Sequence, residues 1–134
     1  MLTKRFPNGR TSLCQAAQEG HSKAVAVLIK ADADVSLNNG ARFTPLFMAA
    51  ATGHATVISE LLEAGADAST DLGDGTTPLI IATSSGHEAA VAVILEAGVD
   101  ANCTTRSRNT ALFMAAQQGY SSIVARLLRA GARV

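Results

Sequence analysis

The chain has 134 residues, the size of one domain and long enough to bury a sizeable core. Nearly half of the residues (48%) are apolar but only 4% are aromatic, so the core must come mainly from Ala, Leu, Val and Ile on closely packed helices. The formal net charge is zero, which gives no general reason to expect nucleic acid or a membrane surface as a partner, and no apolar run could span a bilayer. Cys14 and Cys103 share no metal or redox spacing, so we expect reduced thiols in an intracellular, cytoplasmic protein.

The chain repeats itself at a step of 33 residues without any insertion. The clearest columns are a threonine and a glycine. The threonines are Thr11, Thr44, Thr77 and Thr110, and the glycines are Gly20, Gly53, Gly86 and Gly119. Such a period indicates one unit of supersecondary structure copied four times, each copy burying its apolar face against its neighbours. We place the copies at approximately 6–38, 39–71, 72–104 and 105–134 within a single domain, 1–134.

In chain order, the second copy predicts two helices and a loop. Thr44-Pro45 opens a short helix that ends at Gly53, because proline is favoured at the first helical position and glycine just past the end. His54 to Glu63 carries apolar residues at helical spacing and predicts a second, amphipathic helix, which Gly65 ends. The following stretch, rich in Asp, Gly, Ser and Thr, predicts an extended connection with a tight turn.

These residues resemble the ankyrin repeat family, whose period and T-P-L-H-x-A signature they approach over essentially the whole chain. The closest matches are "TPLFMAAATGHATVISELLEAGADAS" and "TPLIIATSSGHEAAVAVILEAGVDAN", with looser copies at either end. The resemblance implies an all-α solenoid of stacked helix-turn-helix units with protruding β-hairpin-like loops. It also implies a non-catalytic scaffold that binds a partner protein through the concave face, formed by the hairpin tips and the first helices.

Two departures from the family pattern alter local expectations. The signature histidine is absent from all four copies, so we expect neighbouring repeats to be joined there by apolar contact. Its positions hold Cys14, Phe47, Ile80 and Phe113. The turn glycine, present as Gly75, is replaced by Arg42 and Arg108 in the even copies. Because residues other than glycine resist positive φ, we expect those hairpin tips to differ in shape.

No residue pattern indicates catalysis, a cofactor or a metal. His21, His54 and His87 recur one repeat apart, too far for one zinc ion, and we expect each to bond to nearby backbone. The stretch 71–78, "DLGDGTTP", lacks the oxygen ligands of an EF-hand and the Gly-Lys-Ser/Thr of a phosphate loop, so a turn is the better interpretation. No serine lies in a nucleophile-elbow sequence.

The family's partner-binding positions map onto a polar, mixed set of side chains, our candidate contact residues. They are Arg10, Glu19, Arg42, Phe43, Thr52, Asp74, Thr76, Ser85, Arg106, Arg108, Asn109 and Gln118. Phe43 stands out because an aromatic at a tip has little to bury against within its own repeat. It anchors a partner together with Arg42, or it folds back on the adjacent tip. Asn102 lies where asparagines of the family can be hydroxylated; the alternative is that it stabilises its own turn.

Charge and the last repeat suggest alternatives to a scaffold. From Phe43 to Thr105 there is no Lys or Arg, and from Ala101 onward there are five arginines and no acid, so the acidic middle and basic end could pair between molecules in a structural or self-assembling element. The last copy keeps apolar residues such as Leu128 and has a weak polar cap, which suggests self-association or a longer array. A targeting or regulatory module attached to a catalytic domain is a further alternative.

Overall fold

The computed structural model describes residues 11–36 and 43–134, and this part of the chain forms eight helices in four antiparallel pairs. The helices are α1 (Ser12–Glu19), α2 (Ser22–Lys30), α3 (Pro45–Thr52), α4 (Ala55–Glu63), α5 (Pro78–Ser84), α6 (Glu88–Glu96), α7 (Ala111–Gln118) and α8 (Ser121–Arg129). The predicted helix-turn-helix unit is therefore confirmed. The repeat boundaries remain predictions.

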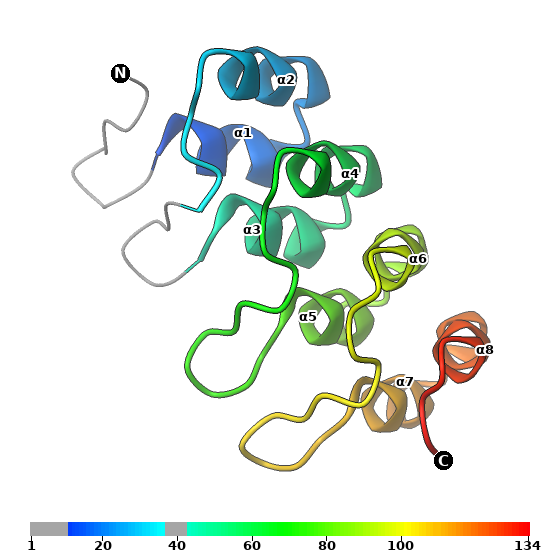
Figure 1. The fold of residues 1–134 in the computed structure, drawn as a ribbon. Coiled ribbons are helices and arrows are strands. Elements are labelled where there is room, and N and C mark those ends of the chain that lie inside the picture. The colour runs from blue at the N-terminus through cyan, green and yellow to red at the C-terminus, as the bar shows by residue number, and fades with distance from the viewer. Residues whose placement is uncertain (1–10, 37–42) are drawn as a thin grey trace.

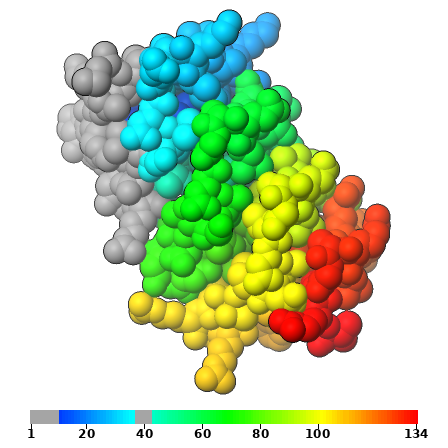
Figure 2. All heavy atoms as spheres, viewed as in Figure 1, coloured from blue at the N-terminus to red at the C-terminus, as the bar shows by residue number. Residues whose placement is uncertain are grey.

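The pairs stack into two layers. The first helices, α1, α3, α5 and α7, pack one on the next, and the second helices, α2, α4, α6 and α8, form the other layer (Figure 1). In the space-filling view the pairs follow one another along the molecule from blue to red, and the tip of the fourth loop projects beyond the helices (Figure 2). This arrangement is the expected all-α solenoid.

Threonine begins every first helix. The hydroxyl oxygen of Thr44 accepts a hydrogen bond from the backbone N–H of Phe47 at 3.2 Å, and Thr11, Thr77 and Thr110 cap their helices in the same way at 3.1 to 3.3 Å. Each bond satisfies one of the N–H groups that a helix leaves unpaired at its start. The repeated threonine is therefore explained by capping.

Small and aliphatic side chains fill the core between the layers. Ala49 and Ala82 are fully buried where the first helices cross, and Ile58, Leu61 and Ile94 are fully buried on the second helices. The alanines allow the close helix approach that the low aromatic content predicts. One polar residue of α5, Thr83, is also fully buried, at a position where the two preceding repeats have alanine.

The loops before α5 and α7 are short hairpins. The N–H of Leu72 donates to the carbonyl of Thr76 at 3.2 Å, and the N–H of Thr105 donates to the carbonyl of Asn109 at 3.0 Å. Among the described residues the pairing is limited to such bonds and one isolated bridge, between Thr104 and Thr110. The expected hairpin-like loops are thus present in the third and fourth repeats.

The fourth tip differs in shape from the third, as expected, although Arg108 does not resist positive φ. Arg108 has a φ of 64°, in the same left-handed region as Gly75 of the third tip, at 86°. The arginine therefore takes the positive φ, at a cost in backbone strain. The rest of the tip differs: Gly73 has a φ of 101°, whereas its equivalent Arg106 has no positive φ and begins a turn in which the N–H of Arg108 donates to the carbonyl of Thr105 at 2.9 Å. Arg42, the other substituted position, lies outside the described residues.

Candidate functional site: the partner-binding surface

Histidines at the start of the second helices join neighbouring repeats. Nε2 of His54 lies 3.1 Å from the carbonyl oxygen of Gln18, and Nε2 of His87 lies 3.1 Å from that of Ala51. A carbonyl can only accept, so the ring nitrogen donates. The expectations of local bonding and of purely apolar junctions were therefore wrong: these side chains reach the preceding repeat, which a search for the signature histidine alone does not reveal.

The same rings explain two of the repeated glycines. A Cβ placed on Gly20 or Gly53 would lie 2.5 Å from the ring of His54 or His87, respectively. Both glycines also have positive φ, 76° and 82°. At each junction the glycine therefore leaves the space that the histidine ring occupies, and the ring in turn excludes a side chain at the glycine position.

Polar side chains also connect the second helices across repeats. The hydroxyl of Ser22 donates to a carboxylate oxygen of Glu60 at 2.7 Å, and Nε of Arg126 donates to Glu88 at 2.9 Å. The latter is an ion pair with both side chains partly exposed, and such pairs contribute about 0 to 1 kcal/mol. One contact between the acidic middle and the basic end is therefore made within the molecule.

Four candidate contact residues occupy one repeated position at the ends of the first helices. Glu19, Thr52, Ser85 and Gln118 are all exposed. Their chemistry differs from repeat to repeat, whereas the capping threonine next to the same helices is constant. The fold therefore constrains this row little, and its side chains are available to a partner.

The third and fourth tips are held side by side. The backbone N–H of Arg106 donates to the carbonyl of Asp74 at 2.8 Å, and a Cβ on Gly75 would lie 2.6 Å from the carbonyl oxygen of Thr104. Hydrogen bonds from the backbone N–H and the side chain of Thr76 lower the pKa of Asp74 below its ordinary value, and the charge of Arg106 acts in the same direction. The two tips thus present an ionised carboxylate beside two exposed arginines, Arg106 and Arg108.

Phe43 and the remaining candidates are more constrained or lie outside the described structure. The ring of Phe43 stacks on that of Phe47 in its own repeat, with centroids 5.3 Å apart and planes at 18°, so the expectation that it had little to bury against there was wrong. Asn109 is half-buried, and its N–H donates to the Thr105 hydroxyl at 3.3 Å. Arg10 and Arg42 fall outside the described residues.

Asn102 fastens the last two repeats together. Its side-chain nitrogen donates to the carbonyl of Gly131 at 3.1 Å, and its side-chain oxygen accepts from the N–H of Arg133 at 2.8 Å. The turn around it is closed instead by Asp100, which accepts from the Asn102 backbone N–H at 2.9 Å. The side chain is thus used between repeats and not within its own turn. Its hydroxylation stays a prediction.

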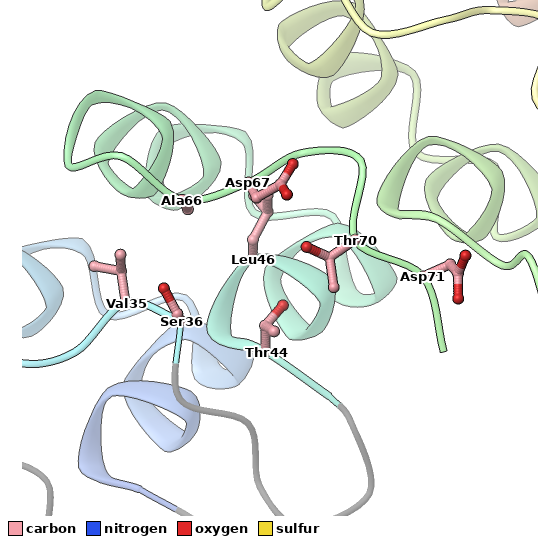
Figure 3. Close-up of a pocket in the computed structure, with 8 residues that line it drawn as sticks. All are labelled: Val35, Ser36, Thr44, Leu46, Ala66, Asp67, Thr70 and Asp71. Atoms are coloured by element: carbon pink, nitrogen blue, oxygen red, sulfur yellow. The ribbon is translucent and has the colours of Figure 1, made fainter. Parts of the chain in front are cut away.

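Two grooves between successive loops were missed by sequence reasoning. The first groove, about 300 Å³, lies between the loops after α2 and α4 and includes Ser36, Leu46 and Asp67 (Figure 3). The second, about 290 Å³, includes Ser69 and Asp100 one repeat further on. Asp71 lines both grooves. The sequence did contain a signal for them: at the repeat position of Asn102, the first and second repeats have serine, Ser36 and Ser69.

The thiols and histidines form no metal centre in the described part of the chain, where no group of three or more His, Cys, Asp or Glu could hold an ion. Cys14 is buried, as expected, and its thiol donates to the carbonyl of Phe43 at 3.6 Å. Cys103 is half-buried, with its sulfur 3.7 Å from the hydroxyl oxygen of Thr77. Of the described helices, none is long and apolar enough to cross a membrane.

Stacked helix pairs, constant capping residues and a variable exposed row define a helical repeat protein of the class that serves as an interaction module. A family model of ankyrin repeats (3 copies) matches residues 1–71 and again residues 64–134. The chain belongs to the ankyrin repeat family, whose members generally mediate protein–protein interaction and are typically not catalytic. A comparison with curated proteins gave no match.

Proposed function

We propose that this protein is a non-catalytic scaffold, acting in the cytoplasm, that binds one partner protein across its hairpin tips and first helices. The observation that carries the proposal is the row formed by Glu19, Thr52, Ser85 and Gln118. Its side chains differ from repeat to repeat on a backbone that is otherwise periodic, as expected where a partner and not the fold selects the residue. The adjoining tips add the exposed charges of Asp74, Arg106 and Arg108.

The experiment is affinity capture with a surface variant and a matched control. The variant combines Arg106→Ala with Gln118→Ala, two exposed side chains on the proposed surface. The control is Lys23→Ala, an exposed substitution on the second-helix layer. We expect proteins captured by the wild type and the control to be lost with the variant while all three unfold at the same temperature. Capture of the same proteins at the same yield by all three would refute the proposed surface.

Phe43 is tested separately because its ring is already engaged. Stacking on Phe47 supports a packing role, and aromatic pairs of this kind contribute about 0.5 to 1.5 kcal/mol beyond their buried area. We expect Phe43→Ala to lower the melting temperature and to leave affinity for the captured partner nearly unchanged. A large loss of affinity at unchanged stability would make Phe43 a partner anchor instead.

Self-association through the last repeat is the second candidate function. Phe113 is 53% exposed and Leu128 42%, whereas Phe47, which occupies the Phe113 position two repeats earlier, is 5% exposed. Measuring the molar mass across a concentration and salt series tests this candidate. We expect association that Phe113→Ser abolishes, and a strict monomer at every concentration would exclude it.

A further inference from the structure

The two inter-loop grooves occupy equivalent places one repeat apart. They adjoin the proposed partner surface, since the second includes Gly75 of the third tip, but none of their described lining residues is a candidate contact residue. Leu46 of the first groove is replaced by Leu79 in the second, and Asp67 by Asp100. Each volume, near 300 Å³, is at the lower limit of small-molecule pockets, about 300 to 1,000 Å³. Such a space suits one long side chain better than a cofactor.

Serine leaves these grooves open. Ser36 and Ser69 stand at the position of Asn102, and all three donate their backbone N–H to an aspartate two residues earlier, at 2.8 to 2.9 Å. The backbone is therefore the same, but only Asn102 extends across to the next loop, where it bonds Gly131 and Arg133. Serine has a hydroxyl where asparagine has the larger carboxamide, so its side chain is too short to reach the next loop. The space that the carboxamide would fill stays free.

The acidic residues that line the grooves favour a cationic ligand. Asp67 and Asp71 line the first groove, Asp71 and Asp100 the second, and among the described residues neither lining includes a Lys or Arg. Asp100 accepts the backbone N–H of Asn102, and Asp67 accepts the backbone N–H and hydroxyl of Ser69 and a bond from the side chain of Thr70; a carboxylate has about four acceptor positions, so both retain acceptor capacity. In Figure 3, Asp67 and Asp71 both belong to the loop after α4: Asp67 lies beside Leu46, and Asp71 lies further along the loop, beyond Thr70.

We propose that the two grooves together bind an extended basic peptide segment, with one Lys or Arg side chain in each. Long cationic side chains place an apolar stem on apolar surface and keep the charged end among polar groups. Val35 and Ala66 in the first groove, and Ala68 and Val99 in the second, are half-buried and provide that surface above the buried Leu46 and Leu79, and the aspartates lie at the edges. Asp71, common to both grooves, faces the peptide between the two cations.

The repeat spacing sets the register of the peptide. Packed helices lie about 8 to 10 Å apart, so equivalent points in neighbouring repeats are separated by about that distance. A polyproline II chain rises about 3.1 Å per residue with three residues per turn, so side chains three positions apart lie on one face, about 9 Å from each other. The peptide should therefore carry its two cationic residues three positions apart.

The test uses two short, proline-rich fluorescent peptides of identical composition. The register peptide has two lysines three positions apart, and the spacing control has them adjacent. Fluorescence anisotropy at physiological ionic strength measures binding to the wild-type protein and to Ser69→Asn, which copies the side chain of Asn102 into the second groove. We expect the register peptide to bind more tightly than the control, and Ser69→Asn to weaken it by about tenfold.

Two further variants separate the groove from general electrostatics. Asp71→Asn removes the shared charge and keeps an oxygen to accept the Gly73 N–H, so we expect a similar loss of binding. Glu63→Gln removes one exposed charge outside both grooves and should leave binding unchanged. Circular dichroism checks that each variant is folded, and Ser36→Asn replaces Ser69→Asn if the latter is not. Equal binding of both peptides, full binding by Ser69→Asn, or no saturable binding by the wild type would overturn the proposal.

Discussion

Thr83 provides the sharpest stability prediction because its hydroxyl is buried without a partner. The residue is fully buried near the end of α5, and its Oγ1 makes no hydrogen bond. Leaving a buried polar group unsatisfied costs about 1 to 3 kcal/mol. Valine has the same branched shape with a methyl group in place of the hydroxyl, and its helix propensity is close to that of threonine. Thr83→Val should therefore raise the free energy of unfolding by about 1 to 3 kcal/mol.

Urea unfolding followed by circular dichroism measures the change, with Thr52→Val as the matched control. Thr52 is exposed, and its hydroxyl donates to the carbonyl of Met48 at 2.7 Å, so its replacement should alter stability by less than about 0.5 kcal/mol. Thr83→Ala should stabilise less than Thr83→Val, because it also removes a methyl group and leaves a small cavity. An unchanged or lower midpoint for Thr83→Val would show that the hydroxyl has a partner and refute the reasoning.

Three more predictions concern the loops. Arg108→Gly should raise the free energy of unfolding by about 0.5 to 1 kcal/mol in a urea titration, because glycine adopts the positive φ without strain; destabilisation would mean that the arginine side chain contributes more than the strain costs. Asn102→Ala should lower the free energy of unfolding by about 1 to 3 kcal/mol and speed amide exchange in residues 131–134, since it removes both side-chain bonds across the last junction; unchanged exchange there would contradict that role. Asp67, whose pKa is lowered by hydrogen bonds from the backbone N–H and hydroxyl of Ser69, stabilises the fold when ionised. Its contribution is therefore complete above the unfolded pKa, near 3.8, and is lost as the pH falls through the lower folded value. Urea midpoints from pH 6 to 3 should fall less steeply for Asp67→Asn than for the wild type, and identical slopes would exclude this contribution.

The periodic part of the fold could be predicted from the sequence because one physical cause acts at each repeated column. The threonine column caps a helix in all four copies, and the helix bounds expected around Gly53 match α3 and α4. The positions that broke the pattern were interpreted less well. Arg108 shows why: the turn does differ from that of the third repeat, but intrinsic preference also predicts that arginine avoids positive φ, and the bonds around the tip override that preference.

Contacts between repeats were harder to predict because their partners lie far apart in the chain. His54 and Gln18 are 36 positions apart, and Ser22 and Glu60 are 38 apart, so neither pair falls in one column of the repeat. The grooves were missed for a similar reason. Their openness depends on whether a side chain such as Asn102 is long enough to reach the next loop, and that distance exists only once the repeats are stacked.

The junction between the third and fourth repeats has a consequence for how the array opens. In a solenoid each unit is stabilised by its own folding and by its interface with each neighbour. The interface between the third and fourth repeats combines the Glu88–Arg126 ion pair, the Asn102 bonds and the bond between hairpin tips. These polar bonds strengthen the coupling between the two repeats. Local opening of the fourth repeat, drawn in orange and red in Figure 1, is thereby coupled to the opening of the third.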